Sequence, residues 1–274
     1  MNPIIQQLSE ELDRMERTSA FQNKVISSMT PSDHSKIVLS SMYGLIGQTE
    51  FFNNYPKLKL EDCSWNEIAM YAKSGMAPAV FAVGDVKRIA LKDGTDIGVR
   101  IIGFNHDFDA NDHPVPISFE TVETLNDDWQ MNSEWMNKGG WEKSQLRAKL
   151  NGSFFDEKLP DELKAVITPC AKITGVGEEK EQKSRTIDKL FILSEQEIFG
   201  RKIYSIGGEG KWYEWYKREN TPYGKCKQSG KRDYWWERSP YGNDATGFCS
   251  VYSNGNADFY YASYSYGVSF GFCV

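Results

Sequence analysis

The sequence predicts an α+β protein, with helices first and short antiparallel strands afterwards. Between Ile5 and Met15, apolar residues recur every three or four positions, which is helical spacing. From residue 86 onward, apolar and polar residues alternate in short runs, which predicts strands. After Gly200, turn-forming Gly, Pro, Asn and Ser recur every few residues with Trp and Tyr between them. This order predicts N-terminal helices followed by a loop-rich domain of short antiparallel strands.

Composition excludes several classes of protein. The 274 residues carry a net charge of −6, so no overall attraction to nucleic acid or to anionic lipid is expected. Residues 201–240 are locally basic, which we interpret as a solvated face. The five cysteines form no CxxC pair, which argues against a zinc knuckle and favours a reducing compartment. The sequence has no signal peptide and no membrane-spanning run, so we expect synthesis in the cytoplasm, with association with a virion as a second location.

The first helices belong to an N-terminal segment, residues 1–75. The stripe between Ile5 and Met15 predicts one helix, and Thr30-Pro31 separates it from a second. Two interpretations stay open: these helices pack on their own domain, or they form a short homo-oligomer seam. Two heptads are marginal alone in water, so the spacing does not decide between the two.

A third helix ends this segment. Ser64 is suited to the N-cap, and Glu67 three residues later completes a capping box. Gly75 is suited to close the helix. Because the pattern changes to strands after this point, we place a domain boundary near residue 75 and a second domain at 76–274.

The second domain starts with a predicted hairpin and continues with short helices. Strands are expected at 86–91 and 97–104, joined by a turn at Asp93-Gly94. Residues 144–150 are expected to form a helix that ends at Asn151-Gly152, and Pro160 is expected to start a helix over 161–167.

The rest of the domain is expected to hold strands and turns. A short buried strand is expected at 190–193, and no helix is expected after Gly200. Residues 268–274 alternate Val and Phe with Ser, Gly and Cys, which predicts a half-buried terminal strand.

Several segments together resemble one known family. They are "WNEIAMYAKSG", "IGFNHD", "GGWEKSQLRAKLN", "LPDELKAVI", "DKLFILSEQEIFG", "WWERSP" and "GVSFGFCV". The family is a domain of unknown biochemical activity that is frequent in gut bacteria and their prophages. The resemblance covers roughly residues 65–274. It implies a C-type lectin-like fold, in the branch that includes formylglycine-generating enzymes and the variable proteins of diversity-generating retroelements.

The resemblance implies a variable region at residues 241–266. Diversity-generating retroelements rewrite the 3′ end of a gene by reverse transcription that is error-prone at adenines, so Asn codons scatter into Tyr, Ser, Asp, Thr, Ala and Gly. The stretch contains these residues and has no Lys, Glu, Leu or Ile. The flanking "WWERSP" and "GVSFGFCV" are then the fixed scaffold.

Composition supports the same interpretation independently. Six of the 26 residues in this stretch are Tyr and four are Ser. Tyr gives a large rigid contact area, and Ser, Gly and Asn give adaptable hydrogen bonds. A core strand would instead carry Val, Ile and Leu on one face. We expect exposed ligand-binding side chains at Tyr241, Asn243, Asp244, Thr246, Ser250, Tyr252, Asn254, Asn256, Asp258, Tyr260, Tyr261, Ser263, Tyr264 and Tyr266. Phe248 and Val251 are expected to be structural.

The implied function is non-covalent recognition of a protein or glycan on a cell surface or a phage's host, with no catalytic residue, metal or cofactor. The alternatives are a copper-dependent oxidase of the formylglycine-generating type, with Cys249 and Cys273 holding Cu(I), and a non-diversified structural prophage protein.

Two other motifs receive structural interpretations. The acidic loop that starts at Asp107 lacks the Gly and Glu of a calcium loop and is read as a solvated turn. Trp235, Trp236 and Arg238 are read as core, with the arginine pairing a buried carboxylate.

Overall fold

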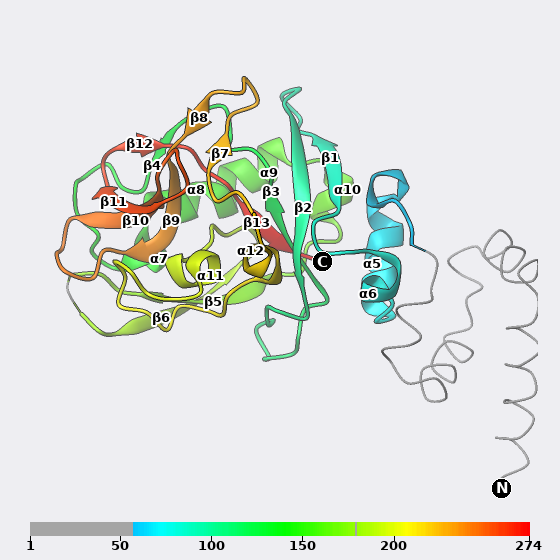
Figure 1. Ribbon diagram of the computed structural model, residues 1–274, viewed down its shortest axis with the longest axis horizontal. Coiled ribbons are helices and arrows are strands. Elements are labelled where there is room, and N and C mark those ends of the chain that lie inside the picture. The colour runs from blue at the N-terminus through cyan, green and yellow to red at the C-terminus, as the bar shows by residue number, and fades with distance from the viewer. Residues whose placement is uncertain (1–56, 179) are drawn as a thin grey trace, which may run out of the picture.

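A computed structural model describes residues 57–178 and 180–274; the two predicted helices before residue 50 lie outside these residues. Figure 1 shows small antiparallel sheets with short helices packed around them, a mixed α+β architecture. The expected α+β class is therefore confirmed. The helical segments are a 3-10 turn η1 (Leu60–Asp62), α5 (Trp65–Lys73), α6 (Ala77–Val80), α7 (Gly140–Lys143), α8 (Gln145–Lys149), a π-helical turn η2 (Leu150–Phe154), α9 (Phe155–Lys158), α10 (Asp161–Lys164), α11 (Glu195–Phe199) and α12 (Glu214–Lys217).

The largest sheet has the order β1-β2-β3-β13, and a three-stranded sheet has the order β11-β10-β9. Three two-stranded ribbons pair β12 with β4, β5 with β6 and β7 with β8. The strands are β1 (Val86–Ala90), β2 (Asp96–Phe104), β3 (Ile117–Thr121), β4 (Trp129–Gln130), β5 (Cys170–Gly175), β6 (Lys183–Asp188), β7 (Lys225–Cys226), β8 (Arg232–Asp233), β9 (Trp235–Pro240), β10 (Gly247–Val251), β11 (Ala257–Tyr261), β12 (Ser265–Tyr266) and β13 (Gly271–Cys273).

The predicted capping box at the start of α5 is confirmed. The Ser64 side chain accepts a hydrogen bond from the Glu67 backbone, and the Glu67 carboxylate accepts one from the Ser64 backbone. The helix buries Trp65, whose ring makes edge contacts with Phe119 and Phe272 at 5.6 and 5.8 Å. The predicted boundary near residue 75 falls just after α5, yet this helix shares its core with the sheet that follows.

The predicted hairpin is also confirmed, because β1 and β2 pair antiparallel across the turn that contains Asp93 and Gly94. The helix expected to stop at Asn151-Gly152 does not stop there. Gly152 has non-helical backbone angles, so the chain kinks through the π-helical turn and continues into α9. Pro160 is the N-cap of α10 rather than its first residue, and α10 ends at Lys164.

Three expectations in the C-terminal part are wrong in detail. Residues 190–193 are buried but make a single bridge, Phe191 to Gly271, and no strand. A short helix, α12, does occur after Gly200. The terminal strand is buried on both faces, since Ser269 and Cys273 are as buried as Phe270 and Phe272. It pairs with β3 along one edge, and Gly271 also pairs with Phe191, so both edges of the strand are hydrogen-bonded.

Candidate ligand-binding surface and the polar network beneath it

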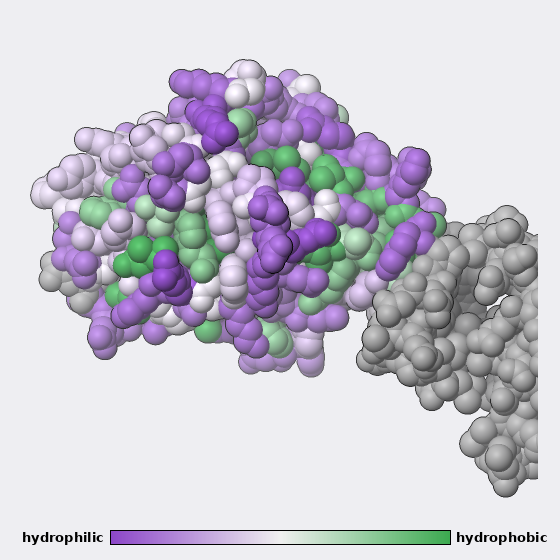
Figure 2. Space-filling model, in the orientation of Figure 1, coloured by the Kyte–Doolittle hydropathy of each residue, from purple (hydrophilic) through white to green (hydrophobic). Residues whose placement is uncertain are grey.

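The predicted variable region forms β10, β11, β12 and the turns between them. Figure 1 places these strands at the opposite end of the described body from α5 and α6. The expected turn at Ser253-Asn254-Gly255 is present between β10 and β11. In Figure 2 the surface at this end is largely pale to light purple, in keeping with its Tyr and Ser content.

Most of the predicted site residues reach the surface. The exposed ones are Asn243, Asn254, Asn256, Tyr261 and Tyr264. The half-buried ones are Tyr241, Asp244, Thr246, Tyr252, Asp258, Tyr260, Ser263 and Tyr266.

Ser250 is the exception, and its expected exposure is wrong. It is fully buried because β10 is the central strand of its sheet, with Asp258 of β11 on one side and Trp236 of β9 on the other. Phe248 and Val251 are buried as expected.

The tyrosines join into a continuous group of rings that we call the aromatic patch. Tyr261 lies 5.7 Å from Tyr264, which lies 5.9 Å from Tyr260, measured between ring centroids. Tyr260 lies 5.0 Å from Tyr266 and 5.8 Å from Tyr234. Offset and edge contacts at such distances are favourable and hold the rings in place. The members of the aromatic patch are Trp135, Tyr234, Tyr252, Tyr260, Tyr261, Tyr264 and Tyr266.

Two members of the patch were missed by sequence reasoning. Trp135 comes from the loop after β4, contacts Tyr261 at 6.1 Å and is 57% exposed, more than Tyr261 or Tyr264. Tyr234 stacks on Tyr266 at 5.1 Å and contacts Tyr252 at 4.5 Å. The signal for Trp135 was a lone Trp among polar residues, which is unusual for a core position.

Tyr241 does not join the aromatic patch. Its ring stacks on Phe259 at 3.8 Å and contacts Tyr204 at 6.2 Å. Phe259 and Tyr260 are neighbours on β11, so their side chains point to opposite faces of the strand. The candidate residues therefore divide between two faces of β11.

The loop between β9 and β10 is held through its backbone by one buried side chain outside the stretch. The Asn137 amide donates to the carbonyls of Gly247 at 2.9 Å, Asp244 at 3.0 Å and Tyr241 at 3.4 Å. The Asn137 backbone N–H donates to the carbonyl of Ala245 at 2.8 Å. None of these bonds depends on the side chain that the loop residue carries.

Other main-chain atoms of the stretch are held in the same way. The Arg232 guanidinium donates to the Ser253 carbonyl, and the Gln130 amide donates to the Ser263 carbonyl. The Gly242 backbone N–H donates to the carbonyl of Tyr204 at 2.8 Å. Residues outside the stretch thus hold several of its main-chain groups, in addition to the pairing of β10 with β11, while many of its side chains face outward.

A network of buried charges lies in the interior of the domain. The Lys172 ammonium contacts the Asp107 carboxylate at 2.5 Å, and Tyr213 and Ser118 donate to the other Asp107 oxygen. Burial raises the pKa of Asp107, but the nearby Lys172 charge and the hydrogen bonds outweigh it, so this pKa lies well below its usual range. Burial lowers the pKa of Lys172, and the charges of Asp107 and Glu197 more than reverse that effect.

Arg238 belongs to this network and pairs with a buried carboxylate, as the sequence predicted. It donates to both oxygens of Glu197 and to the carbonyls of Ile192 and Glu209. Glu197 also completes a capping box with Ser194 at the start of α11. Trp235 and Trp236 are fully buried, which confirms that this segment is core.

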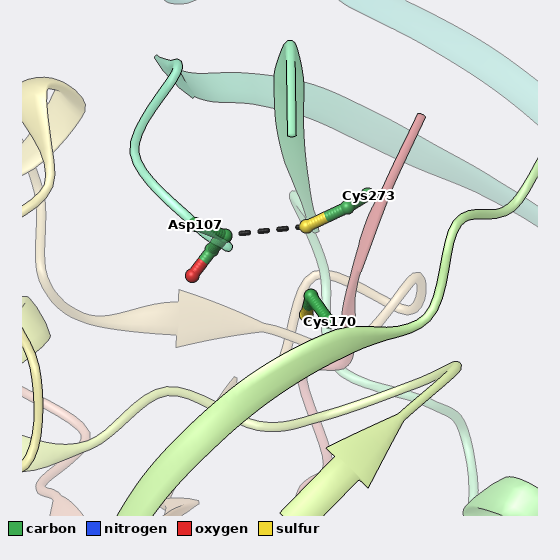
Figure 3. Close-up of side chains that lie close together, drawn as sticks. All are labelled: Asp107, Cys170 and Cys273. Atoms are coloured by element: carbon green, nitrogen blue, oxygen red, sulfur yellow. Dashed lines mark hydrogen bonds between the residues drawn. The ribbon is translucent and has the colours of Figure 1, made fainter. Parts of the chain in front are cut away.

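The two cysteines of the oxidase alternative lie in different surroundings. The Cys273 thiol donates to Asp107 at 3.4 Å and lies beside Cys170, as Figure 3 shows. Cys249 lies instead beside Glu195 and Glu237. Burial raises the pKa of both thiols well above its usual value, which makes each a poor nucleophile. Their positions do not support a copper site built from Cys249 and Cys273.

Within the described residues, two groups of side chains have ligand atoms close enough to hold a metal ion. One is Asp107 with Cys170 and Cys273, and the other is Glu195 with Glu237 and Cys249. The acidic loop after Asp107 closes on itself instead: Asp109 accepts backbone hydrogen bonds from Asn111 and His113.

The fold and this surface define a mixed α+β domain that displays aromatic side chains on short antiparallel strands. A family described as a domain of unknown function, DUF6273, matches residues 118–274, and the chain belongs to this family. Neither the curated proteins nor the solved structures gave a match. No helix within the described residues is long and apolar enough to cross a membrane.

Proposed function

We propose that this chain is the variable protein of a diversity-generating retroelement and that residues 241–266 form its ligand-binding surface. The observation that carries the proposal is the way the stretch is anchored. Residues outside it, above all Asn137, hold its backbone through carbonyl groups. A surface built in this way keeps its shape while many of its side chains are replaced.

We further propose that the fold is C-type lectin-like, in the branch that includes formylglycine-generating enzymes. Small antiparallel sheets joined by long loops support this, as does the pairing of terminal strand β13 with β3. The fold matters for function because it places the variable strands on a buried core of fixed residues, such as Trp235 and Trp236.

The aromatic patch is proposed to make the central contacts with the ligand. Tyr261 is 48% exposed and Tyr264 is 46% exposed, so both present ring surface to a partner. Packed rings lose little conformational freedom on binding, and Tyr and Trp are the common hot-spot residues of interfaces. Asn243, Asn254 and Asn256 lie exposed in the stretch and offer adaptable hydrogen bonds.

The ligand proposed is a protein or glycan on a cell surface or on a phage's host. No catalytic group, metal or cofactor is needed for such recognition. The surface lies at the far end of the described body from α5, which suits display away from an N-terminal attachment. Display of several copies would strengthen weak single-site binding.

The test is to sequence codons 213–274 across many members of the natural population. The proposal expects substitutions at adenine positions of codons for surface residues such as Tyr261, Tyr264 and Asn243. Codons for buried Phe248 and Val251 are expected to stay fixed. The tyrosine codons of Tyr213 and Tyr216 serve as controls, because these buried residues lie outside the stretch. Changes that are mostly silent and evenly spread over all these codons would overturn the proposal.

A further inference from the structure

A bulge in β9 brings three acidic or thiol side chains together beneath the variable strands. Phe248 pairs with Pro240 and Ser250 pairs with Trp236, so the three residues from Glu237 to Ser239 lie opposite Cys249 alone. Bulges of this kind are frequent next to functional sites because they redirect side chains. Here one oxygen each of Glu195 and Glu237 and the sulfur of Cys249 lie within 4.8 Å of one another.

Glu237 is the least satisfied side chain in this group. Its exposed fraction is 0%, and neither carboxyl oxygen has a hydrogen-bond partner among residues 57–178 and 180–274. Buried polar atoms are nearly always paired, since each unpaired one costs about 1–3 kcal/mol. Glu237 has two unpaired oxygens and lies beside another carboxyl group and a thiol, so its environment requires an explanation.

Glu195 supplies a carboxyl group whose position is fixed next to Glu237. Its two oxygens accept backbone hydrogen bonds from Ile203 and Tyr204 at 2.7 Å and from Ser205 at 2.9 Å. These bonds hold the Glu195 side chain beside Glu237 and Cys249.

The buried cations of the charge network described above do not pair with Glu237. Lys172 and Arg238 are already bonded to Asp107 and Glu197.

The second candidate metal group serves as an internal comparison. Asp107, Cys170 and Cys273 are equally close together, but the Lys172 ammonium, Tyr213 and Ser118 already satisfy the Asp107 carboxylate. That group needs no ion. The group around Glu237 has the same kinds of atoms, but both Glu237 oxygens lack a partner within the described residues.

We propose that Glu195, Glu237 and Cys249 bind one divalent cation of the zinc class. Two carboxylates and a thiolate are ligands that Zn²⁺ accepts, whereas Mg²⁺ and Ca²⁺ prefer oxygen ligands throughout. Glu209, which lies near this group, adds a further buried oxygen, Oε2, without a partner in the described chain. The ion would tie α11 to β9 and β10, and so fix the bulge from below. Cys249 belongs to the stretch 241–266 but is buried, so the site includes none of its exposed side chains.

The first measurement is the metal content of the purified full chain, prepared without chelators, by elemental mass spectrometry. We expect one equivalent of a zinc-class metal per chain and a lower melting temperature after chelation that added Zn²⁺ restores. Glu237→Gln keeps the shape of the side chain and should reduce Zn²⁺ affinity roughly tenfold or more, in the range seen when groups that support a metal are altered. Cys249→Ser should act in the same direction.

Cys170→Ser is the matched control, because it alters the thiol of the comparison group. It should leave the metal content unchanged. The proposal is overturned if the wild-type chain carries no metal and added Zn²⁺ does not raise its melting temperature. It is also overturned if Glu237→Gln melts at the same or a higher temperature with unchanged metal content, because Glu237 then holds a proton instead. If that variant does not fold, the wild-type measurements alone decide.

Discussion

Asn137 is the residue on which the shape of the loop from Tyr241 to Gly247 depends. Its side chain is buried and donates to three loop carbonyls, while its own oxygen accepts from the Glu178 backbone. Asn137→Ala should lower the free energy of unfolding by about 2–3 kcal/mol, because several buried backbone groups lose their partner. Urea denaturation measures this change.

Asn243→Ala is the control for Asn137→Ala, since Asn243 is exposed on the same loop. Its effect should stay within about 0.5 kcal/mol. Equal effects of the two changes would show that the loop does not depend on Asn137.

Replacing the surface residues Tyr261 and Tyr264 should change the free energy of unfolding much less than replacing the buried Phe248. Tyr261→Ala and Tyr264→Ala remove half-exposed rings and should each change the free energy of unfolding by about 1 kcal/mol or less. Phe248→Ala in β10 creates a buried cavity and should cost about 3–5 kcal/mol. Thermal or denaturant unfolding separates the two classes. A large loss from either tyrosine would mean that these rings are ordinary structure and not a replaceable surface.

At the scale of elements, local signals were sufficient for α5 and for the β1–β2 hairpin. A capping box and a tight turn are short-range features, and each acts within a few residues. The helix end predicted at Gly152 is wrong because that prediction also used only local sequence. A glycine after a helical run usually ends a helix, but here packing carries the chain through a π-helical kink into α9.

The candidate surface was predictable only as far as it is contiguous in sequence. Strand β10 and the turn at Ser253-Asn254-Gly255 are local features, and the high Tyr content can be counted directly from the sequence. Trp135 and Tyr234 join the aromatic patch through tertiary contacts with Tyr261 and Tyr260, which no local pattern reports. Ser250 is buried because β10 lies between two other strands, and strand order is likewise a non-local property.

The capping box of α5 gives a prediction at the same scale. Ser64→Ala removes the side-chain acceptor for the Glu67 backbone and should lower the free energy of unfolding by about 1 kcal/mol. The loss should appear in global unfolding, because Trp65 joins the core around Phe119. Ser74→Ala, at the other end of the helix, is the control and should change stability less. If Ser64→Ala lowered only the circular-dichroism signal of helix and left the midpoint of global unfolding unchanged, α5 would unfold separately from the rest of the domain.

For the whole molecule, the buried charges connect segments that are distant in sequence. Asp107 follows β2, Lys172 lies on β5, Glu197 on α11 and Arg238 on β9. Burying such charges is costly unless they are paired, so each ion pair depends on its partner being in place. The folded arrangement of these four elements is therefore coupled to the ionisation of Asp107 and Glu197.

This coupling predicts how stability depends on pH. Burial raises the pKa of Glu197, but Arg238 and Lys172 outweigh it, so Glu197 and Asp107 both have a lowered pKa in the folded state. Each therefore contributes stability that is present above its unfolded pKa, near 4, and is lost as pH falls through the folded pKa. Glu209 acts in the opposite direction: burial raises its pKa to about 7, so its contribution falls as pH rises from about 4.5 to 7.

Lys172→Met removes the Lys172 ion pairs with Asp107 and Glu197, and the effect of Glu209 is common to both proteins. At pH 7 the variant should be less stable by about 3–5 kcal/mol, since a buried carboxylate loses its cation. The difference should shrink as pH falls, because burial without the ammonium raises the pKa of Asp107 and its carboxyl then takes up a proton at a higher pH in the variant than in the wild type. Lys180→Met, which removes an exposed ion pair with Glu178, should change stability by less than about 1 kcal/mol at every pH. Urea unfolding from pH 7 to pH 3 measures these values, and a Lys172→Met effect that is constant over this range would contradict the coupling.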